Sequence, residues 1–239
     1  FFVTKKGRVK RTSIRAYQNI RANGIRAIDL KENDELLAVR HTSGDQDLIL
    51  GASNGKAIRF KETDVRVMGR TAAGVSGMRL ADGEEVIGAA QITNEEQTIL
   101  VVSEKGYGKR SKAELYRQQK RGGRGVKTLQ VTEKNGPLVK LRSVSDDDDL
   151  VLVSNKGMMI RIPIIQISES GRATQGVRLM RMQKGQNVAN IAIVKHEDEP
   201  EETLLDGLEK TPLKVQETNA EEKSESVLQE SLLDLLDEE

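Results

Sequence analysis

The residues with the clearest chemistry are four cations packed around three glycines between residues 118 and 128. The segment reads QQKRGGRGVKT, and its cations are Lys120, Arg121, Arg124 and Lys127. Glycine lets the backbone turn sharply and bring its N–H groups close to an anion, while Lys and Arg supply positive charge. This combination predicts contact with phosphate groups.

Two other interpretations of this segment fit the sequence poorly. A Walker-type phosphate loop ends in Lys-Ser/Thr and leads into a helix, whereas this segment leads into the alternating VKTLQVTE. A disordered RGG tail is a low-complexity run, whereas this segment stands in register with three similar segments. Nucleotide binding and an RGG tail are therefore both weak explanations.

The remaining composition argues against an active site. The 239 residues include no Cys, and the two His are His41 and His196. Thiolate metal sites are thus excluded, and a His-rich site is disfavoured. The close carboxylates form the acidic run 146–149, which we expect to be a solvated turn. We predict no catalytic residue, metal site or cofactor in this chain.

Charge divides the chain into a basic body and an acidic tail. Residues 1–195 hold 35 Lys and Arg against 21 Asp and Glu, a net charge of +14, while residues 196–239 hold 3 against 16, a net charge of −13. A polyanion is the partner that this asymmetry favours for the body. No apolar run approaches the roughly 18 residues of a membrane span, so no membrane contact is predicted. The opening FFVTKKGRVKR lacks Met and a signal-peptide pattern, which predicts a fragment of a longer protein.

A repeat of about 50 residues defines the elements that must position these cations. Each copy opens with an apolar run, a turn glycine and a second run, and Lys-Gly or Asn-Gly between two such runs predicts a β-hairpin. The turn glycines are Gly7, Gly55, Gly106 and Gly157. An arginine follows each of them by four residues: Arg11, Arg59, Arg110 and Arg161.

Each copy continues with a short corner that runs from an arginine to a glycine. The four corners read RANG, RTAAG, RGGRG and RATQG, and they begin at Arg21, Arg70, Arg121 and Arg172. A further strand follows each corner after a polar turn. Short strands at this period, without helical periodicity, predict an all-β array of four blades. The expected blades are 1–46, 47–97, 98–148 and 149–195.

The tail, residues 196–239, is predicted to be mostly disordered because it combines low hydrophobicity with high negative charge. Leucines at helical spacing near its end, in residues 226–237, are the pattern of a short amphipathic helix. Because the tail and the body carry opposite charges, we expect the tail to compete with a polyanion for the basic surface of the body. A merely solubilising tail is the alternative.

Equivalent positions in stacked blades repeat along one rim, so the recurring cations predict a curved track for the phosphates of duplex DNA. Binding would be largely independent of sequence. The alternatives are arginines that cover blade edges or pair with acids, and a propeller-like module that binds acidic proteins. The predicted DNA-binding residues are Arg11, Arg21, Arg59, Arg70, Lys109, Arg110, Lys120, Arg121, Arg124, Lys127, Arg161, Arg172 and Arg178.

These residues resemble the C-terminal DNA-wrapping domain of the DNA gyrase A protein, of Gram-positive type, over residues 1–195. EKGYGKR, GRTAAGVSGMRL and GRATQGVRLMRM are similar to segments of that family. The resemblance implies a β-pinwheel of six propeller-like blades, about four of them in this chain, with a strand contributed between neighbours. The segment similar to the family's QRRGGKG box consists of Gln119, Lys120, Arg121, Gly122, Gly123, Arg124 and Gly125.

The resemblance also implies a place in an ATP-dependent type II topoisomerase of the bacterial cytoplasm and nucleoid. DNA wrapped on the basic perimeter would let the A2B2 assembly of gyrase A and gyrase B introduce negative supercoils. ATP, Mg²⁺ and the catalytic tyrosine would belong to other parts of that enzyme. The family's box lies in its first blade, whereas here the similar corner is in the third repeat. We therefore expect the principal box upstream of Phe1; the equivalent domain of topoisomerase IV is an alternative.

Overall fold

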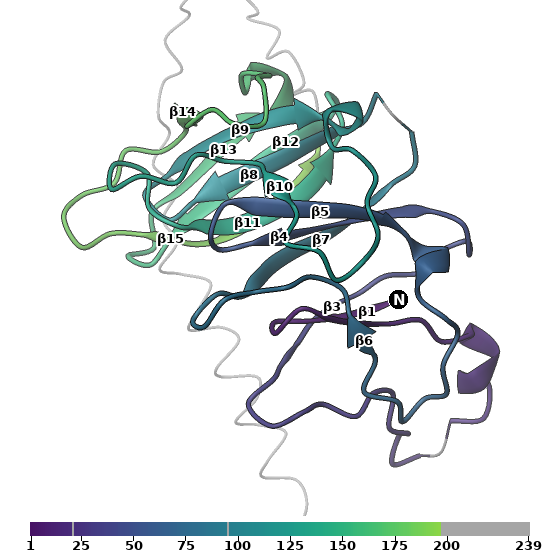
Figure 1. Cartoon of the computed structure of the whole chain (residues 1–239). Coiled ribbons are helices and arrows are strands. Elements are labelled where there is room, and N and C mark those ends of the chain that lie inside the picture. The colour runs from purple at the N-terminus through teal and green to yellow at the C-terminus, as the bar shows by residue number, and fades with distance from the viewer. Residues whose placement is uncertain (21, 95, 197–239) are drawn as a thin grey trace, which may run out of the picture. The chain divides into compact units, whose positions relative to one another are not determined.

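The computed structural model describes residues 1–20, 22–94 and 96–196, which form an all-β fold. They contain fifteen strands in four antiparallel sheets, and no α-helix occurs in these three ranges. Figure 1 shows the sheets following one another in chain order, from the purple N-terminal sheet to the green last sheet. The predicted all-β array of bladed repeats is therefore confirmed.

Each sheet is built around a hairpin, and a short 3-10 turn follows each hairpin. The first sheet has the order β3 (Leu36–Val39), β1 (Phe2–Thr4), β2 (Arg8–Lys10) and β6 (Val75–Ser76). The second has the order β7 (Val86–Ile92), β4 (Asp47–Ala52), β5 (Lys56–Lys61) and β10 (Val126–Lys127). The third has the order β11 (Leu138–Val144), β8 (Thr98–Ser103), β9 (Tyr107–Lys112) and β14 (Val177–Arg178). The fourth has the order β15 (Val188–Lys195), β12 (Asp148–Ser154) and β13 (Met159–Pro163). The 3-10 turns are η1 (Ile14–Tyr17), η2 (Glu62–Asp64), η3 (Ala113–Leu115) and η4 (Ile164–Gln166).

The hairpin turns have the left-handed glycine predicted from the sequence. The Gly55 carbonyl accepts hydrogen bonds from the N–H groups of Thr128 at 2.8 Å and Leu129 at 3.1 Å. A Cβ on Gly55 would lie 2.5 Å from the Leu129 carbonyl oxygen, so backbone of the following repeat covers this turn. Glycine is required there both for its φ and for this close approach. The turn glycines have φ between 76° and 78°: Gly7, Gly55, Gly106 and Gly157.

The outer strand of each of the first three sheets comes from the following repeat. β6 pairs with β2, β10 pairs with β5, and β14 pairs with β9. These strands begin at Val75, Val126 and Val177, directly after the corners. In the fourth sheet, no described residue pairs with the free edge of β13. The exchanged strand that the family resemblance implies is therefore present in three sheets.

The central strands are buried on both faces, which explains why their sequences are continuous apolar runs. In β4, Leu48 and Leu50 face a core shared with the first sheet, whereas Ile49 faces a core shared with the third. In β8, Ile99 faces the core shared with the second sheet, and Leu100 faces a core shared with the fourth. Three apolar cores thus join the four sheets.

Consecutive sheets also contact one another along one edge, through β3, β7, β11 and β15. At Gly88 in β7, a Cβ would lie 2.5 Å from the carbonyl oxygen of Leu141 in β11, so glycine permits this close approach. The exchanged strands β6, β10 and β14 form the opposite edges of their sheets. We call these three strands, together with the corners that precede them, the outer edge.

Candidate nucleic-acid interface

The corner at residues 121–125 lies on the outer edge of the second sheet, directly before β10. Gly122 and Gly125 have φ of 80° and 72°, which glycine adopts without strain. The Gly122 N–H donates a 2.6 Å hydrogen bond to the Gly77 carbonyl, and the Arg79 N–H donates a 2.9 Å bond to the Gly123 carbonyl. The glycines therefore hold the corner against the preceding repeat.

Three cations in this corner or directly beside it are exposed, and a fourth, Arg121, holds the corner in place. The Lys120 side chain is 91% exposed, with Nζ 3.1 Å from Oδ1 of Asp64. Arg124 and Lys127 are exposed, and their side chains make no hydrogen bond or ion pair with the described residues. Arg121 is half-buried and donates from Nε to the Asp64 carbonyl at 3.0 Å and from Nη1 to a carbonyl of β6 at 3.0 Å. The charge open to an anion belongs to Lys120, Arg124 and Lys127.

The corner arginines of the second and fourth repeats are also tied to their surroundings. Arg172 donates from Nη1 to the Lys127 carbonyl at 2.8 Å, and its guanidinium lies 5.9 Å from the centroid of the Tyr116 ring. Arg70 is half-buried, and its carbonyl accepts a hydrogen bond from the Lys10 ammonium. Arg21, which opens the first corner, lies outside the described residues.

The hairpin arginines of the second and third sheets are buried between repeats. Arg59 is 8% exposed; its Nη2 lies 2.7 Å from Oδ2 of Asp47, and its Nη1 donates to the Ala113 carbonyl at 3.1 Å. Arg110 is 7% exposed and donates from Nε to the Ile167 carbonyl at 2.8 Å. Each guanidinium thus joins its own sheet to the η3 or η4 region of the following repeat. DNA contact by these two residues stays a prediction that their burial does not favour.

The two terminal hairpin arginines are more accessible. Arg11 is half-buried and donates from Nη1 to the Gly44 carbonyl at 3.0 Å. The Arg161 side chain is 48% exposed, with Nε 2.6 Å from Oδ2 of Asp149. Its Nη2 also donates to the Lys195 carbonyl of its own repeat at 3.4 Å.

Lys109 lies beneath the fourth corner rather than on the surface. It is fully buried, and Nζ donates to the Arg172 carbonyl at 2.7 Å and to the Gly171 carbonyl. Burial, with a smaller contribution from the Arg172 charge, lowers the pKa of Lys109 to about 8. Lys10, also buried, holds the second corner in the same manner. These two lysines are structural supports for their corners.

Arg178, at the end of β14, is an exposed cation on the outer edge of the third sheet. It donates from Nη2 to the Tyr107 hydroxyl at 3.0 Å, and its guanidinium lies 5.6 Å from the Tyr107 ring centroid. The outer edges of the second and third sheets therefore both present exposed positive charge, through Lys127 and Arg178 at equivalent positions.

Comparison with known proteins assigns this arrangement to a family. The model of the DNA gyrase C-terminal domain, beta-propeller, matches the chain at residues 1–43, 46–93, 97–145 and 148–195. The chain belongs to this DNA gyrase C-terminal domain family. The four matched segments correspond to the four repeats, so the assignment rests on the whole described body.

Relatives of known sequence agree with this assignment. The DNA gyrase A protein of Staphylococcus epidermidis strain ATCC 12228 is 46% identical over 199 residues, which is 83% of this chain and 22% of that protein. The DNA gyrase A protein of Staphylococcus aureus strain NCTC 8325 is 44% identical over 228 residues, which is 95% of this chain and 25% of that protein. The gyrase-family chain spans about a quarter of the length of these relatives.

Solved structures have the same fold as this gyrase-family chain. The C-terminal domain of DNA topoisomerase IV superimposes with a TM-score of 0.77 at 29% identity, covering 81% of this chain and 61% of that one. The DNA gyrase A C-terminal domain superimposes with a TM-score of 0.72 at 26% identity, covering 81% and 64%. The β-pinwheel architecture implied by the sequence resemblance is thus confirmed.

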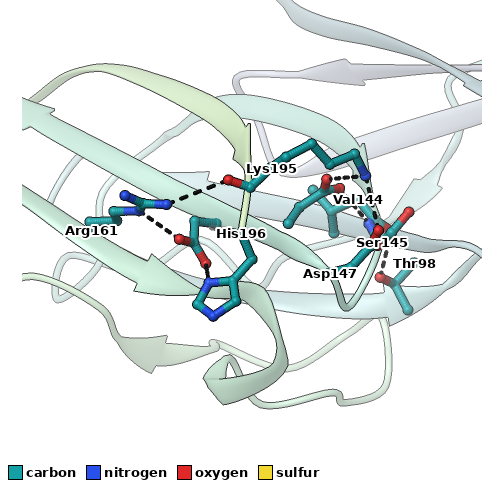
Figure 2. A network of polar contacts seen from close by, with 9 residues as sticks. Thr98, Val144, Ser145, Asp147, Arg161, Lys195 and His196 are labelled. Atoms are coloured by element: carbon teal, nitrogen blue, oxygen red, sulfur yellow. Dashed lines mark hydrogen bonds and ion pairs between the residues drawn. The ribbon is translucent and has the colours of Figure 1, made fainter. Parts of the chain in front are cut away.

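The acidic run of this gyrase-family chain corrects one prediction. Asp148 and Asp149 begin β12 and are 8% and 1% exposed, so the expectation of a fully solvated turn is wrong for them. The cause is a pair of bonds that Asp149 accepts, from Nε of Arg161 at 2.6 Å and from Nδ1 of His196 at 2.8 Å. Figure 2 labels these two partners, Arg161 and His196. Although burial opposes ionisation, these two bonds hold the pKa of Asp149 below its ordinary value. The carboxylates fasten the end of β15 to the sheet.

The described residues of the chain contain no group of three or more His, Cys, Asp or Glu side chains placed to hold a metal ion. None of the helices among those residues has the length and apolar character needed to cross a membrane.

Sequence reasoning missed one exposed cation beside the box-like corner of this gyrase-family chain. Arg79 belongs to the preceding repeat, yet its N–H bonds to the Gly123 carbonyl at 2.9 Å and its side chain is exposed. The sequence did contain a signal for Arg79, because an arginine occupies the equivalent position of the fourth repeat. Arg79 follows Met78 in the second repeat, and Arg181 follows Met180 in the fourth. Strand exchange brings Arg79 to a corner that is more than 40 residues away in sequence.

Proposed function

We propose that this chain binds duplex DNA along its outer edge and bends it, as the wrapping domain of a type II topoisomerase. The observation that carries this proposal is the exposed charge on consecutive outer edges, from Lys120, Arg124 and Lys127 at the second sheet to Arg178 at the third. Family membership supports the proposal, because the model of the DNA gyrase C-terminal domain matches all four repeats of the body.

The energetics of bending are compatible with such a surface. Bending a site of about 20 to 30 bp through 40 to 90° costs on the order of 1 to 6 kcal/mol. Neutralising each phosphate releases condensed counterions, and about 6 to 10 contacts change affinity by roughly 10³ to 10⁵ between 50 and 200 mM salt. The exposed cations of a body with a net charge of +14 can supply contacts of this number. The described residues contain no α-helix that could read base edges, so recognition would follow DNA deformability.

The exposed cations are the contacts that we propose to be used directly. Arg121, Arg172 and Lys109 would act by holding the corners in shape, since their polar atoms are bonded to backbone carbonyls. Arg11, Arg70 and Arg161 are partly accessible and remain proposed contacts. The corner at 119–125 would be a secondary DNA contact, with the family's principal box in a blade upstream of Phe1.

Replacing two exposed cations of the corner tests this function. Lys120→Ala with Arg124→Ala should weaken retardation of duplex DNA in gels and reduce the slope of log K against log salt by roughly 2, since each phosphate contact contributes about 0.9. Lys61→Ala with Lys112→Ala is a matched control, because both lysines are exposed at the ends of β5 and β9. A salt-independent interaction, or equal losses in both variants, would contradict the proposal.

In the complete enzyme, the bent DNA would be presented to a cleavage gate so that strand passage introduces negative supercoils. We propose that the catalytic tyrosine and the binding sites for ATP and Mg²⁺ lie in other parts of an A2B2 assembly. This assembly would work in the bacterial cytoplasm, at the nucleoid. The likeness to the topoisomerase IV C-terminal domain, at a TM-score of 0.77, supports a second candidate. Supercoiling of relaxed plasmid by the complete enzyme favours gyrase, whereas relaxation and decatenation alone favour topoisomerase IV.

The acidic tail is proposed to compete with DNA for the basic body. Its charge of −13 motivates this proposal, and its residues 197–239 lie outside the described part of the chain. Deleting residues 197–239 should tighten DNA binding at low salt, and the gain should shrink as salt screens the charges. Unchanged affinity at low salt would leave the tail with a solubilising role instead.

A further inference from the structure

The third sheet carries a basic cavity at the turn end of its hairpin. The cavity has a volume of about 580 Å³ and is lined by the hairpin turn, by Arg178 of β14 and by the loop that leads into β15. Among the described residues, its lining contains no Asp or Glu. Five of the lining residues are cations: Lys105, Lys134, Arg178, Arg181 and Lys184.

Tyr107 organises the cations at the base of the cavity. Its side chain is largely buried, and the Arg178 guanidinium both bonds its hydroxyl at 3.0 Å and lies 5.6 Å from its ring centroid. The Lys134 ammonium lies 5.5 Å from the same centroid. An aromatic ring attracts cations through its quadrupole, so Tyr107 gathers two positive charges without neutralising either.

The other three cations of the lining, Lys105, Arg181 and Lys184, form no ion pair with the described residues. Arg181 and Lys184 are exposed, and neither side chain has a hydrogen bond or ion pair with the described residues. The Lys105 ammonium bonds the Glu133 carbonyl, which leaves its charge in place. The nearby Glu104 carboxylate accepts a 3.0 Å bond from Nδ2 of Asn187 and does not line the cavity.

Comparison with the other repeats indicates that this charge is not needed for the fold. The loop at 181–187 reads RMQKGQN, with a net charge of +2, while its counterparts at 29–35 and 79–85 read DLKENDE and RLADGEE, with net charges of −3 and −2. The three loops share one turn, with its central residue at positive φ in Asn33, Gly83 and Gly185. The same turn therefore carries acids in the first and second repeats and is basic in the fourth.

We propose that this basic cavity binds backbone phosphates of duplex DNA, as a contact distinct from the corner at 119–125. Several cations around a cavity without carboxylates favour closely spaced anionic oxygens, and the Arg guanidinium matches phosphate geometry. Arg178 belongs to β14, so the cavity adjoins the outer edge, where the proposed function places DNA; the inference rests on that proposed function.

A proximity probe tests where the DNA lies. The sequence contains no Cys, so Gln183→Cys in the full chain gives one attachment site for an iron–EDTA reagent. Gln183 is exposed at the cavity and its hydrogen bonds there are made by the backbone. In the complex, the probe at 183 should cut the DNA backbone strongly, and a probe at Lys112→Cys should cut weakly. Equal cutting from both positions, with DNA binding intact, would overturn the proposal.

A charge-matched pair of variants tests the contribution to affinity. Arg181→Gln with Lys184→Asp uses the residues that other repeats carry at these positions, Gln130 and Asp82, so the turn should be retained. Lys61→Gln with Lys112→Asp changes the net charge by the same amount elsewhere. The cavity variant should lose roughly tenfold or more in DNA affinity and about 2 in salt slope. The control should lose much less, and equal losses would overturn the proposal.

Two further results distinguish failure of the cavity proposal from failure of the proposed function. If the unaltered chain fails to bind DNA at all, the proposed function is wrong and the cavity proposal falls with it. If the chain binds DNA but the cavity variant loses only binding to sodium tripolyphosphate, measured by calorimetry, the cavity is a site for free polyphosphate. That result would overturn the DNA contact while leaving the proposed function standing.

Discussion

At the scale of single residues, burial separates cations that support the fold from cations that are open to an anion. Arg59, Lys109 and Arg110 are all less than 9% exposed and bonded to carbonyls, whereas Lys120 is almost fully exposed. All four were predicted as DNA contacts, Arg59 and Arg110 because they recur in register and Lys120 as part of the box-like segment. The sequence does not distinguish them, since both faces of these sheets are covered and alternation no longer marks a solvent side.

Lys109 gives a pH-dependent prediction about stability. Its pKa is about 8 in the folded chain against an ordinary value of 10.5, so between these values the unfolded state binds more protons. Stability contributed by this group therefore rises as pH increases from about 8 toward 10.5, by at most about 3 kcal/mol. The free energy of unfolding of the wild type minus that of Lys109→Met, from urea titrations, should increase over this range.

A second variant controls for the many other groups that titrate at alkaline pH. Lys112→Met removes an exposed lysine from the same strand, and its difference from the wild type should stay flat over the same pH range. If the Lys109 and Lys112 variants showed parallel pH dependence, the ammonium of Lys109 would not be desolvated in the folded state.

At the scale of elements, the hairpins follow from the sequence and the strand exchange does not. Lys-Gly and Asn-Gly between apolar runs predict the turns, and Gly55 has the positive φ that they require. The exchanged strands such as β10 (Val126–Lys127) have two residues, too few to show a period. Their pairing with the preceding repeat was implied by the family resemblance, and in the structure it includes hydrogen bonds from Thr128 and Leu129 to the Gly55 carbonyl.

Two glycines at the same turn position test the exchange. A Cβ at Gly157 meets nothing within 4 Å, so Gly157→Ala should cost about 1 to 2 kcal/mol for its positive φ alone. At Gly55, with the same φ, a Cβ would lie 2.5 Å from the Leu129 carbonyl oxygen, and overpacking should add about 1 to 3 kcal/mol. Urea unfolding measures both, and equal losses would mean that no strand covers the Gly55 turn.

At the scale of the whole molecule, three apolar cores join four sheets, so the cations of successive outer edges are held on one continuous scaffold. Loop charge then differs between repeats without a change of turn, as at 79–85 and 181–187. The division into a basic body and an acidic tail was readable from composition. The basic cavity was not, because strand exchange and loop packing bring its cations together from two repeats.

We propose that the body bends and wraps DNA rather than merely binding it. Nicked circular plasmid can be ligated in the presence of the full chain and its linking number read after the protein is removed. We predict a shift in linking number that grows with the ratio of protein to DNA and is reduced by Lys120→Ala with Arg124→Ala. An unchanged linking number, at protein concentrations that fully retard the same plasmid, would show that the body binds DNA without wrapping it.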